Sequence, residues 1–208
     1  IGGLDKQVGI ECQVYTSENN SWLFEFPSLP KGRFNSVCFV YRDSLYVFGG
    51  TDNSSNMNEI VRYDLSTQNS GEWTTIAKVN EANQRGGVAF VVEDKVYAGL
   101  GEKSNGIRNG FYVSSDSLTK WELIPSIPAQ LGVISSGVYD EQKKSFFMID
   151  NDGKIWEYNL TTEQWTSRSL WIRMKNYHMF MLDGSIYILG QDIYQKNKFT
   201  VYNPIWDN

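Results

Sequence analysis

Histidine and cysteine are nearly absent from this sequence, which has one histidine and two cysteines among 208 residues. Zinc and copper sites are built mainly from imidazole and thiolate ligands, so a usual site of either kind would need carboxylates placed by chance. Cys12 and Cys38 show no metal-ligand spacing and lie in strand-like apolar text, which favours reduced, buried side chains over a disulfide. We therefore expect no metal and no cofactor.

Long apolar runs and clusters of positive charge are also missing. The longest uninterrupted apolar runs are about six residues, whereas a helix needs about 20 to cross a bilayer. The net charge is −5, and no basic stripe of the kind that neutralises phosphates is present. We therefore expect neither membrane insertion nor nucleic-acid binding.

Signatures of nucleophilic catalysis are absent as well. His178 stands alone in NYHMFML, without a Ser or Cys nucleophile motif, and is interpreted as a structural or incidental pore-side residue. The segment from Asp150 to Gly153 looks like half of a calcium loop but lacks the distal glutamate, so a hairpin turn explains it better. The sequence predicts no catalytic residue and favours a non-enzymatic protein.

What the chain does have is a surplus of aromatic residues, 14% of the total, arranged as an internal repeat. Five tryptophans lie 51, 48, 44 and 41 residues apart, and each follows a tyrosine by four to eleven residues. A period near 50 residues indicates a series of similar supersecondary units. The pairs are Tyr15 and Trp22, Tyr63 and Trp73, Tyr112 and Trp121, Tyr158 and Trp165, and Tyr202 and Trp206.

Each repeat accommodates four short strands. In the first full repeat, the apolar runs 36–41 and 44–50 are joined by Arg42-Asp43, a tight polar turn typical of a hairpin. Both runs are apolar on two faces, as expected where a sheet is sandwiched between neighbours. The other two strands are expected at residues 60–65 and 72–76.

This pattern resembles the kelch-repeat β-propeller family over essentially the whole chain. The resemblance is carried by the double glycine after the second strand (Gly2-Gly3, Gly49-Gly50), the tyrosine of the third strand and the tryptophan of the fourth. The doublet departs from the family pattern at Leu100-Gly101, Asp150-Asn151 and Gly190-Gln191.

The resemblance implies an all-β, kelch-type β-propeller of about four and a half four-stranded blades, forming part of a larger ring. Both ends offer a third-strand segment, at 10–15 and 198–203, and these would compete for one place in a closed ring. Either more chain exists, or a missing chain or an oligomer partner covers the open sheet edges. The blades are expected at residues 1–30 (partial), 31–79, 80–128, 129–170 and 171–208 (partial).

Three arginines escape a packing explanation: Arg33, Arg85 and Arg173 each lead into the first strand of a repeat. They stand 13, 12 and 14 residues before the second-strand tyrosines of their repeats. In a propeller this phase lies near one mouth of the central channel, where forked guanidinium donors would suit an anion or carboxylate. The alternative is that each arginine caps loop carbonyls or pairs with a loop acid such as Asp52, Glu59 or Glu102.

The sequence therefore predicts a shallow polar site at that mouth, where loops collect functional groups over a rigid scaffold. A non-catalytic module that binds a glycan or protein partner is favoured; the alternatives are a sialate-epimerase-like kelch enzyme acting on an acidic sugar and a kelch adaptor or scaffold. Phrases such as FYVSSDSLTKWELIP look more like secreted or periplasmic bacterial kelch proteins than cytoplasmic adaptors. The predicted ligand-binding residues are Arg33, Arg85, Arg173, Trp171, Asp52, Arg108 and Tyr194, with Tyr177 as a further aromatic surface.

Overall fold

The computed structural model describes residues 1–4, 8–67, 70–106, 108–115, 117–171, 174–192 and 194–202, without the side chains of residues 23–25, 115, 169–171 and 175. Within these ranges the chain is built mainly of β-strands, and its helical segments are two short 3-10 turns, Leu65–Thr67 and Asn80–Ala82. No helix in the described ranges is long and apolar enough to span a membrane. The predicted all-β class is confirmed.

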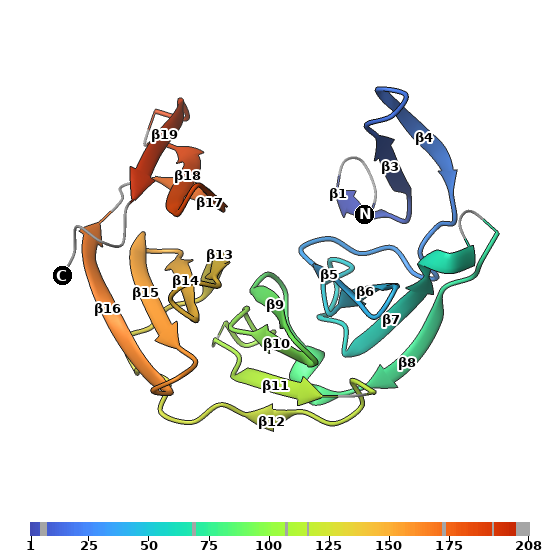
Figure 1. Cartoon of the computed structure of the whole chain (residues 1–208). Coiled ribbons are helices and arrows are strands. Elements are labelled where there is room, and N and C mark those ends of the chain that lie inside the picture. The colour runs from blue at the N-terminus through green and yellow to red at the C-terminus, as the bar shows by residue number, and fades with distance from the viewer. Residues whose placement is uncertain are drawn as a thin grey trace.

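Three four-stranded antiparallel sheets form the middle of the molecule, each a meander of consecutive strands. They fan around a common centre with the first strand of each sheet innermost, which is the arrangement of a β-propeller (Figure 1). The first sheet has β5 (Val37–Tyr41), β6 (Ser44–Phe48), β7 (Glu59–Asp64) and β8 (Thr74–Lys78); the second has β9 (Val88–Val92), β10 (Lys95–Gly99), β11 (Phe111–Ser115) and β12 (Glu122–Leu123); the third has β13 (Ile134–Asp140), β14 (Ser145–Asp150), β15 (Lys154–Asn159) and β16 (Gln164–Trp171).

Smaller sheets lie at the two ends, and the ring is open between them (Figure 1). With these partial sheets, the count agrees with the predicted four and a half blades. That the described blades belong to a larger ring stays a prediction. The N-terminal ladders are β1 (Gly3–Leu4) with β2 (Val8–Gly9) and β3 (Cys12–Thr16) with β4 (Ser21–Phe26); the C-terminal sheet is β17 (Lys175–Leu182), β18 (Ser185–Gln191) and β19 (Asn197–Tyr202).

Tight turns join the first two strands of each sheet at the predicted positions. Arg42 and Asp43 have φ angles of 45° and 55°, so both central residues of the hairpin are left-handed, as a type I′ turn requires. Asp183 and Gly184 repeat this arrangement with φ angles of 49° and 72°. Such turns match the twist of the flanking strands, and they set the register of the two innermost strands in each sheet.

The double glycine after β6 has the mechanical role expected of it. Gly49 and Gly50 have φ angles of 64° and 95°. A Cβ atom on Gly49 would lie 2.5 Å from the backbone oxygen of Ala82, which belongs to the connection into the next sheet. In the second sheet Leu100 takes a left-handed conformation, with a φ of 63°, and accepts the strain that glycine avoids.

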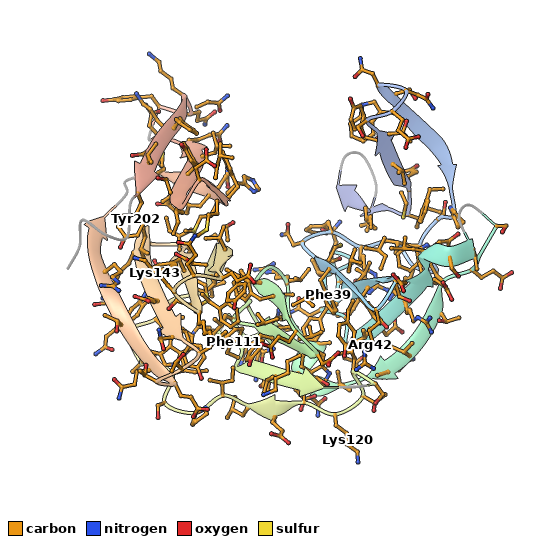
Figure 2. All side chains as sticks on the ribbon, in the orientation of Figure 1. Phe39, Arg42, Phe111, Lys120, Lys143 and Tyr202 are labelled. Atoms are coloured by element: carbon orange, nitrogen blue, oxygen red, sulfur yellow. The ribbon has the colours of Figure 1, made fainter. Side chains whose placement is uncertain are left out.

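The repeated aromatic side chains pack each sheet onto the one before it (Figure 2). Tyr63 is fully buried against the β3–β4 ladder, and its ring centroid lies 5.3 Å from that of Trp73. The Trp73 indole nitrogen donates a hydrogen bond to the Pro27 carbonyl oxygen at 2.9 Å. Tyr158 and Trp165 form the equivalent pair in the third sheet, with centroids 4.8 Å apart. The repeat period is therefore the period of inter-blade packing.

The two cysteines are both free thiols in the described structure. Cys12 is buried as predicted, but the prediction of a buried Cys38 is wrong. Cys38 lies on the face of β5 that is directed away from the second sheet, and in the described chain no inner strand covers that face.

Candidate functional site

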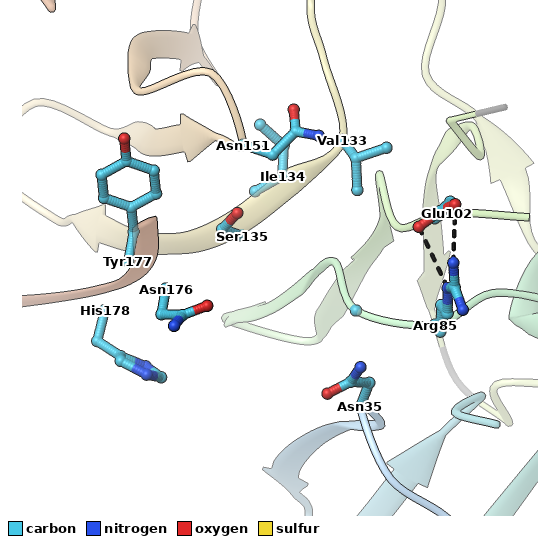
Figure 3. Close-up of a pocket in the computed structure, with 11 residues that line it drawn as sticks. Asn35, Arg85, Glu102, Val133, Ile134, Ser135, Asn151, Asn176, Tyr177 and His178 are labelled. Atoms are coloured by element: carbon cyan, nitrogen blue, oxygen red, sulfur yellow. Dashed lines mark hydrogen bonds and ion pairs between the residues drawn. The ribbon is translucent and has the colours of Figure 1, made fainter. Parts of the chain in front are cut away.

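A cavity of about 590 Å³ lies where the inner strands of four consecutive sheets begin. Figure 3 shows side chains reaching it from the connections into β5, β9, β13 and β17 and from the loops after β10 and β14. This volume is within the range of small-molecule sites, roughly 300–1,000 Å³. The lining residues are Asn35, Arg85, Gly86, Glu102, Val133, Ile134, Ser135, Asn151, Asn176, Tyr177 and His178.

Arg85 and Glu102 form the charged side of the cavity. The Arg85 guanidinium donates to both carboxylate oxygens of Glu102, at 3.2 Å from Nε and 3.0 Å from Nη2 (Figure 3). This bidentate bond raises the pKa of Arg85, and the backbones of the two residues also pair. Because the Arg85 side chain is 48% exposed, the pair presents polar edges to the cavity rather than filling the core.

Arg33 does not share this environment, and the structure does not bring it to the cavity. Its side chain is 0% exposed. Nη1 donates to the Gly49 carbonyl oxygen at 3.1 Å, and Nη2 pairs with the Glu59 carboxylate at 3.3 Å. Burial lowers the pKa of Arg33, and the Glu59 charge opposes that shift. Arg33 thus follows the alternative expectation, in which the arginine donates to a loop carbonyl and pairs with a loop acid.

The two arginines differ because they stand at different register positions. Phe39 pairs with Tyr46 across β5 and β6, and Phe90 pairs with Tyr97 at the same place in the second sheet. Arg33 precedes Phe39 by six residues, whereas Arg85 precedes Phe90 by five. A shift of one residue turns a side chain to the opposite face of an extended segment, so Arg33 enters the core and Arg85 reaches the cavity.

Gln84 is the residue that takes the place of Arg33 in the second sheet, six residues before Phe90, and it is likewise fully buried. Its side chain accepts hydrogen bonds from the Gly101 backbone nitrogen at 3.1 Å and from the Asn109 carboxamide at 3.0 Å. This position of the repeat therefore serves packing, with arginine in one sheet and glutamine in the next.

A second repeated position brings left-handed residues to the cavity rim. Asn35, Gly86 and Asn176 have φ angles of 51°, 66° and 55° at equivalent points, before β5, before β9 and at the start of β17, and all three line the cavity. Asparagine and glycine are the residues that tolerate this conformation best. The same local turn therefore presents two exposed carboxamides, from the first and last of the four sheets, to one space.

Two of the other predicted residues are held by neighbouring backbone. Arg108 donates from Nε to the Leu131 carbonyl oxygen at 2.9 Å and from Nη1 to the Asn109 carbonyl oxygen at 3.1 Å. The Asp52 carboxylate forms a salt bridge with the Lys31 ammonium at 2.7 Å and accepts hydrogen bonds from Ser54. These interactions lower the pKa of the Asp52 carboxyl. Neither residue lines the cavity.

Of the remaining aromatic and basic predictions, Tyr177 alone reaches the cavity in the part of the chain that the structure describes. Tyr194 is exposed, at 76%, in the loop after β18. Tyr177 lines the cavity but is buried, and its hydroxyl accepts a hydrogen bond from the Met174 backbone nitrogen at 3.2 Å, so it is no exposed plate for a sugar ring. Arg173 and the side chain of Trp171 lie outside the described residues.

Sequence reasoning missed the carboxamides and undervalued His178. Asn35, Asn151 and Asn176 line the cavity, and His178 is exposed beside them (Figure 3). The only sequence signal for them was position: Asn35 and Asn176 each stand four residues before the phenylalanine of the inner-strand aromatic pair. Aligning the repeats on that phenylalanine rather than on the second-strand tyrosine alone would have found them.

No group of three or more His, Cys, Asp or Glu side chains that could hold a metal occurs in the described ranges. The segment from Asp150 to Gly153 is a hairpin turn between β14 and β15, as predicted. The Asp150 carboxylate is buried and accepts hydrogen bonds from the backbone nitrogens of Asp152 at 3.1 Å and Lys154 at 2.9 Å and from the Trp156 indole nitrogen at 2.9 Å. Its oxygens are thus directed at the turn and the neighbouring strand.

The fold and this central cavity define the chain as a β-propeller with a polar channel mouth. A family model described as the kelch motif matches residues 32–80, which contain the whole first four-stranded sheet. The structure of YjhT is similar, with a TM-score of 0.78 and 15% identity over 98% of this chain and 80% of that chain. The chain is therefore a β-propeller, and its first four-stranded sheet matches the kelch motif.

The comparisons leave the function of the chain open. In all, 532 chains of solved structures match it, so the fold by itself selects no single activity. No curated protein matches the sequence. The function must therefore be argued from the cavity and its side chains.

Proposed function

We propose that this chain is a non-catalytic binding module that recognises a glycan or a protein partner through the loops at one propeller face. The observation that carries the proposal is the convergence of four consecutive sheets on one polar cavity of about 590 Å³. Rigid strands hold the cavity floor, and loops and left-handed turns supply its polar groups. A kelch propeller of this kind supports a binding role in general, and the cavity side chains indicate which class of ligand is favoured.

A glycan is favoured over a protein partner by the composition of the cavity wall. Asn35, Asn151 and Asn176 each offer a carboxamide, which can donate and accept hydrogen bonds at the same time. Sugar hydroxyls are also both donors and acceptors, so carboxamides pair with them without a charge mismatch. The Arg85–Glu102 pair adds directed charged partners at one side.

The enzyme alternative is favoured by one feature of the same pair. An arginine and an acid at a channel mouth could hold the carboxylate of an acidic sugar and move a proton, as the resemblance to sialate-epimerase-like kelch proteins implies. In this structure Glu102 accepts hydrogen bonds from Nε and Nη2 of Arg85. Anomer exchange of N-acetylneuraminic acid, followed by proton NMR, distinguishes the two: acceleration that depends on Glu102 would favour the enzyme.

Arg85→Ala is expected to weaken glycan binding about 10-fold to 100-fold while leaving the fold intact, because a bond to a charged group is worth roughly 1.5–3 kcal/mol. Binding would be measured by calorimetry with the strongest ligand from an oligosaccharide array. Arg62→Ala is the matched control, since Arg62 pairs with Asp64 on β7 and does not line the cavity. Equal loss in both variants, or none in Arg85→Ala, would contradict the proposal.

We also propose a partner-binding surface, separate from the cavity, on the face of the C-terminal sheet that is directed away from the third sheet. Phe180 and Tyr187 stack there with centroids 5.2 Å apart, and Phe199 lies 5.4 Å from Tyr187. In the first sheet the equivalent pair, Phe39 and Tyr46, stacks in the same way at 5.3 Å and is buried by the second sheet. In the described chain Phe180 is 40% exposed and Phe199 56% exposed.

The occupant that fits this face is a further propeller sheet, because that is what covers the equivalent face three times within the chain. We expect the 208-residue chain to associate at high concentration and to bind an apolar dye. Phe180→Ser with Phe199→Ser should reduce both effects several-fold with little loss of stability, as judged by light scattering and dye fluorescence. A wild-type chain that stays monomeric and binds no dye would exclude this surface.

A further inference from the structure

A second cavity, of about 330 Å³, adjoins the first one. Asn176 and His178 line both cavities, so the two spaces meet at the start of β17. The second space continues over the ends of β18 and β19. Its lining residues are Asn176, His178, Leu189, Gly190, Gln191, Asn197 and Lys198.

A series of carboxamides crosses the junction between the cavities. The Asn176 amide nitrogen donates to the Gln191 side-chain oxygen at 3.1 Å, and the Gln191 amide nitrogen donates to the Asn197 side-chain oxygen at 3.5 Å. Each carboxamide has two donor hydrogens and two acceptor lone pairs, so each keeps unused capacity for a ligand. The groups are exposed or half-exposed, and β18 beneath them is paired with both β17 and β19.

Among the side chains that the structure describes, the charged groups of this combined lining lie toward its two ends. Arg85 and Glu102 stand at the first-cavity end. At the other end, the Lys198 ammonium lies 3.7 Å from the Asp192 carboxylate, so both ends carry opposite charges that are already paired. Between them the walls consist of amides, His178 and apolar side chains such as Leu189. An extended ligand along this path meets, among the described side chains, hydrogen-bonding groups that carry no net charge.

We propose that the two cavities form one groove for an uncharged oligosaccharide of several units. The first cavity holds one end unit beside Arg85 and Glu102, and the second holds the following units along Gln191 and Asn197. The side-chain carboxamides of Asn176, Gln191 and Asn197 lie along this path, which favours a sugar over an extended peptide. The inference rests on the proposed glycan-binding function and specifies its ligand class.

The test uses an array of uncharged homo-oligosaccharides of glucose, galactose, mannose and N-acetylglucosamine, each one to six units long. Calorimetry then follows the series that binds best. We expect affinity to rise at least tenfold between one unit and the length that fills both cavities. Asn197→Ala and Gln191→Ala should each weaken binding of the longest member by roughly fivefold to tenfold, which is the loss of about one hydrogen bond. Binding of the single unit should not change.

Leu189→Trp places a large ring in the second cavity, which Leu189 lines without lining the first, and should abolish the dependence on chain length while single-unit binding persists. Asn80→Ala is the matched control, since Asn80 is an exposed asparagine outside both cavities. If single units bind as tightly as long chains and Asn197→Ala has no effect, the groove is wrong and the glycan function stands. If no glycan binds, both are wrong.

Discussion

Arg33→Met is expected to lower the free energy of unfolding by about 3 kcal/mol, because it removes one partner of a buried, hydrogen-bonded charge pair. Arg33 is fully buried, and its guanidinium links the Gly49 carbonyl oxygen to the Glu59 carboxylate. Methionine keeps much of the side-chain volume but leaves that carbonyl without its donor. Glu59 keeps Lys78, at 3.4 Å, and is partly exposed, which limits the loss.

Urea unfolding followed by tryptophan fluorescence would measure the change. Arg42→Met is the matched control, since Arg42 is exposed and pairs with an exposed Asp94 at 3.5 Å. Exposed pairs contribute roughly 0–1 kcal/mol, so the control should unfold almost as wild type does. The buried assignment of Arg33 would be refuted if Arg33→Met kept wild-type stability and lost ligand binding instead.

Phe146→Ala is expected to destabilise the chain by roughly 3–5 kcal/mol, the usual cost of truncating a buried phenylalanine. Phe146 is fully buried between the second and third sheets. Its ring stacks on Phe90 with centroids 4.2 Å apart and meets Tyr97 at 5.0 Å and Phe111 at 6.0 Å. Alanine would leave a cavity among rigid strands that cannot close over it.

Phe199→Ala removes the same side chain from an exposed position and should change stability far less. If Phe146→Ala fails to fold, Phe146→Leu provides a graded test, with an expected loss of about 1–2 kcal/mol. The measurement is again the free energy of unfolding in urea. Equal stability of Phe146→Ala and Phe199→Ala would show that the rings around Phe146 do not carry inter-blade cohesion.

The blades themselves could be predicted because their signals are local. Arg42-Asp43 and Asp183-Gly184 have the residue types of tight hairpins, and the structure shows left-handed angles at all four positions. Tyr63 and Trp73 repeat because each sheet needs the same aromatic contact with its predecessor. The turn residues and the aromatic contacts between sheets recur with each repeat, so the repeat period of the sequence indicates both.

The sequence predicted that loops and inner-strand connections meet at one face, but it could not show which of their side chains share a space. Loops and inner-strand connections do meet at one cavity, and Arg85 lines it. Arg33 fails by one residue of register, since the side chains of an extended segment alternate between faces and spacing from the second strand varies with the hairpin. Arg33 stands six residues before the inner-strand phenylalanine of its sheet and Arg85 stands five. This difference of one residue places Arg33 in the core and Arg85 at the cavity.

The sequence by itself determined the class of fold, the number of repeats and the absence of the usual metal-ligand motifs, because these depend on composition and short-range pattern. Only the tertiary structure decided which side chains share a space. Asn35 and Asn176 are 141 positions apart, and they face one cavity because the sheets curve around a common centre and each turn has the same left-handed geometry. Convergence of this kind is a property of the ring, which no single repeat contains.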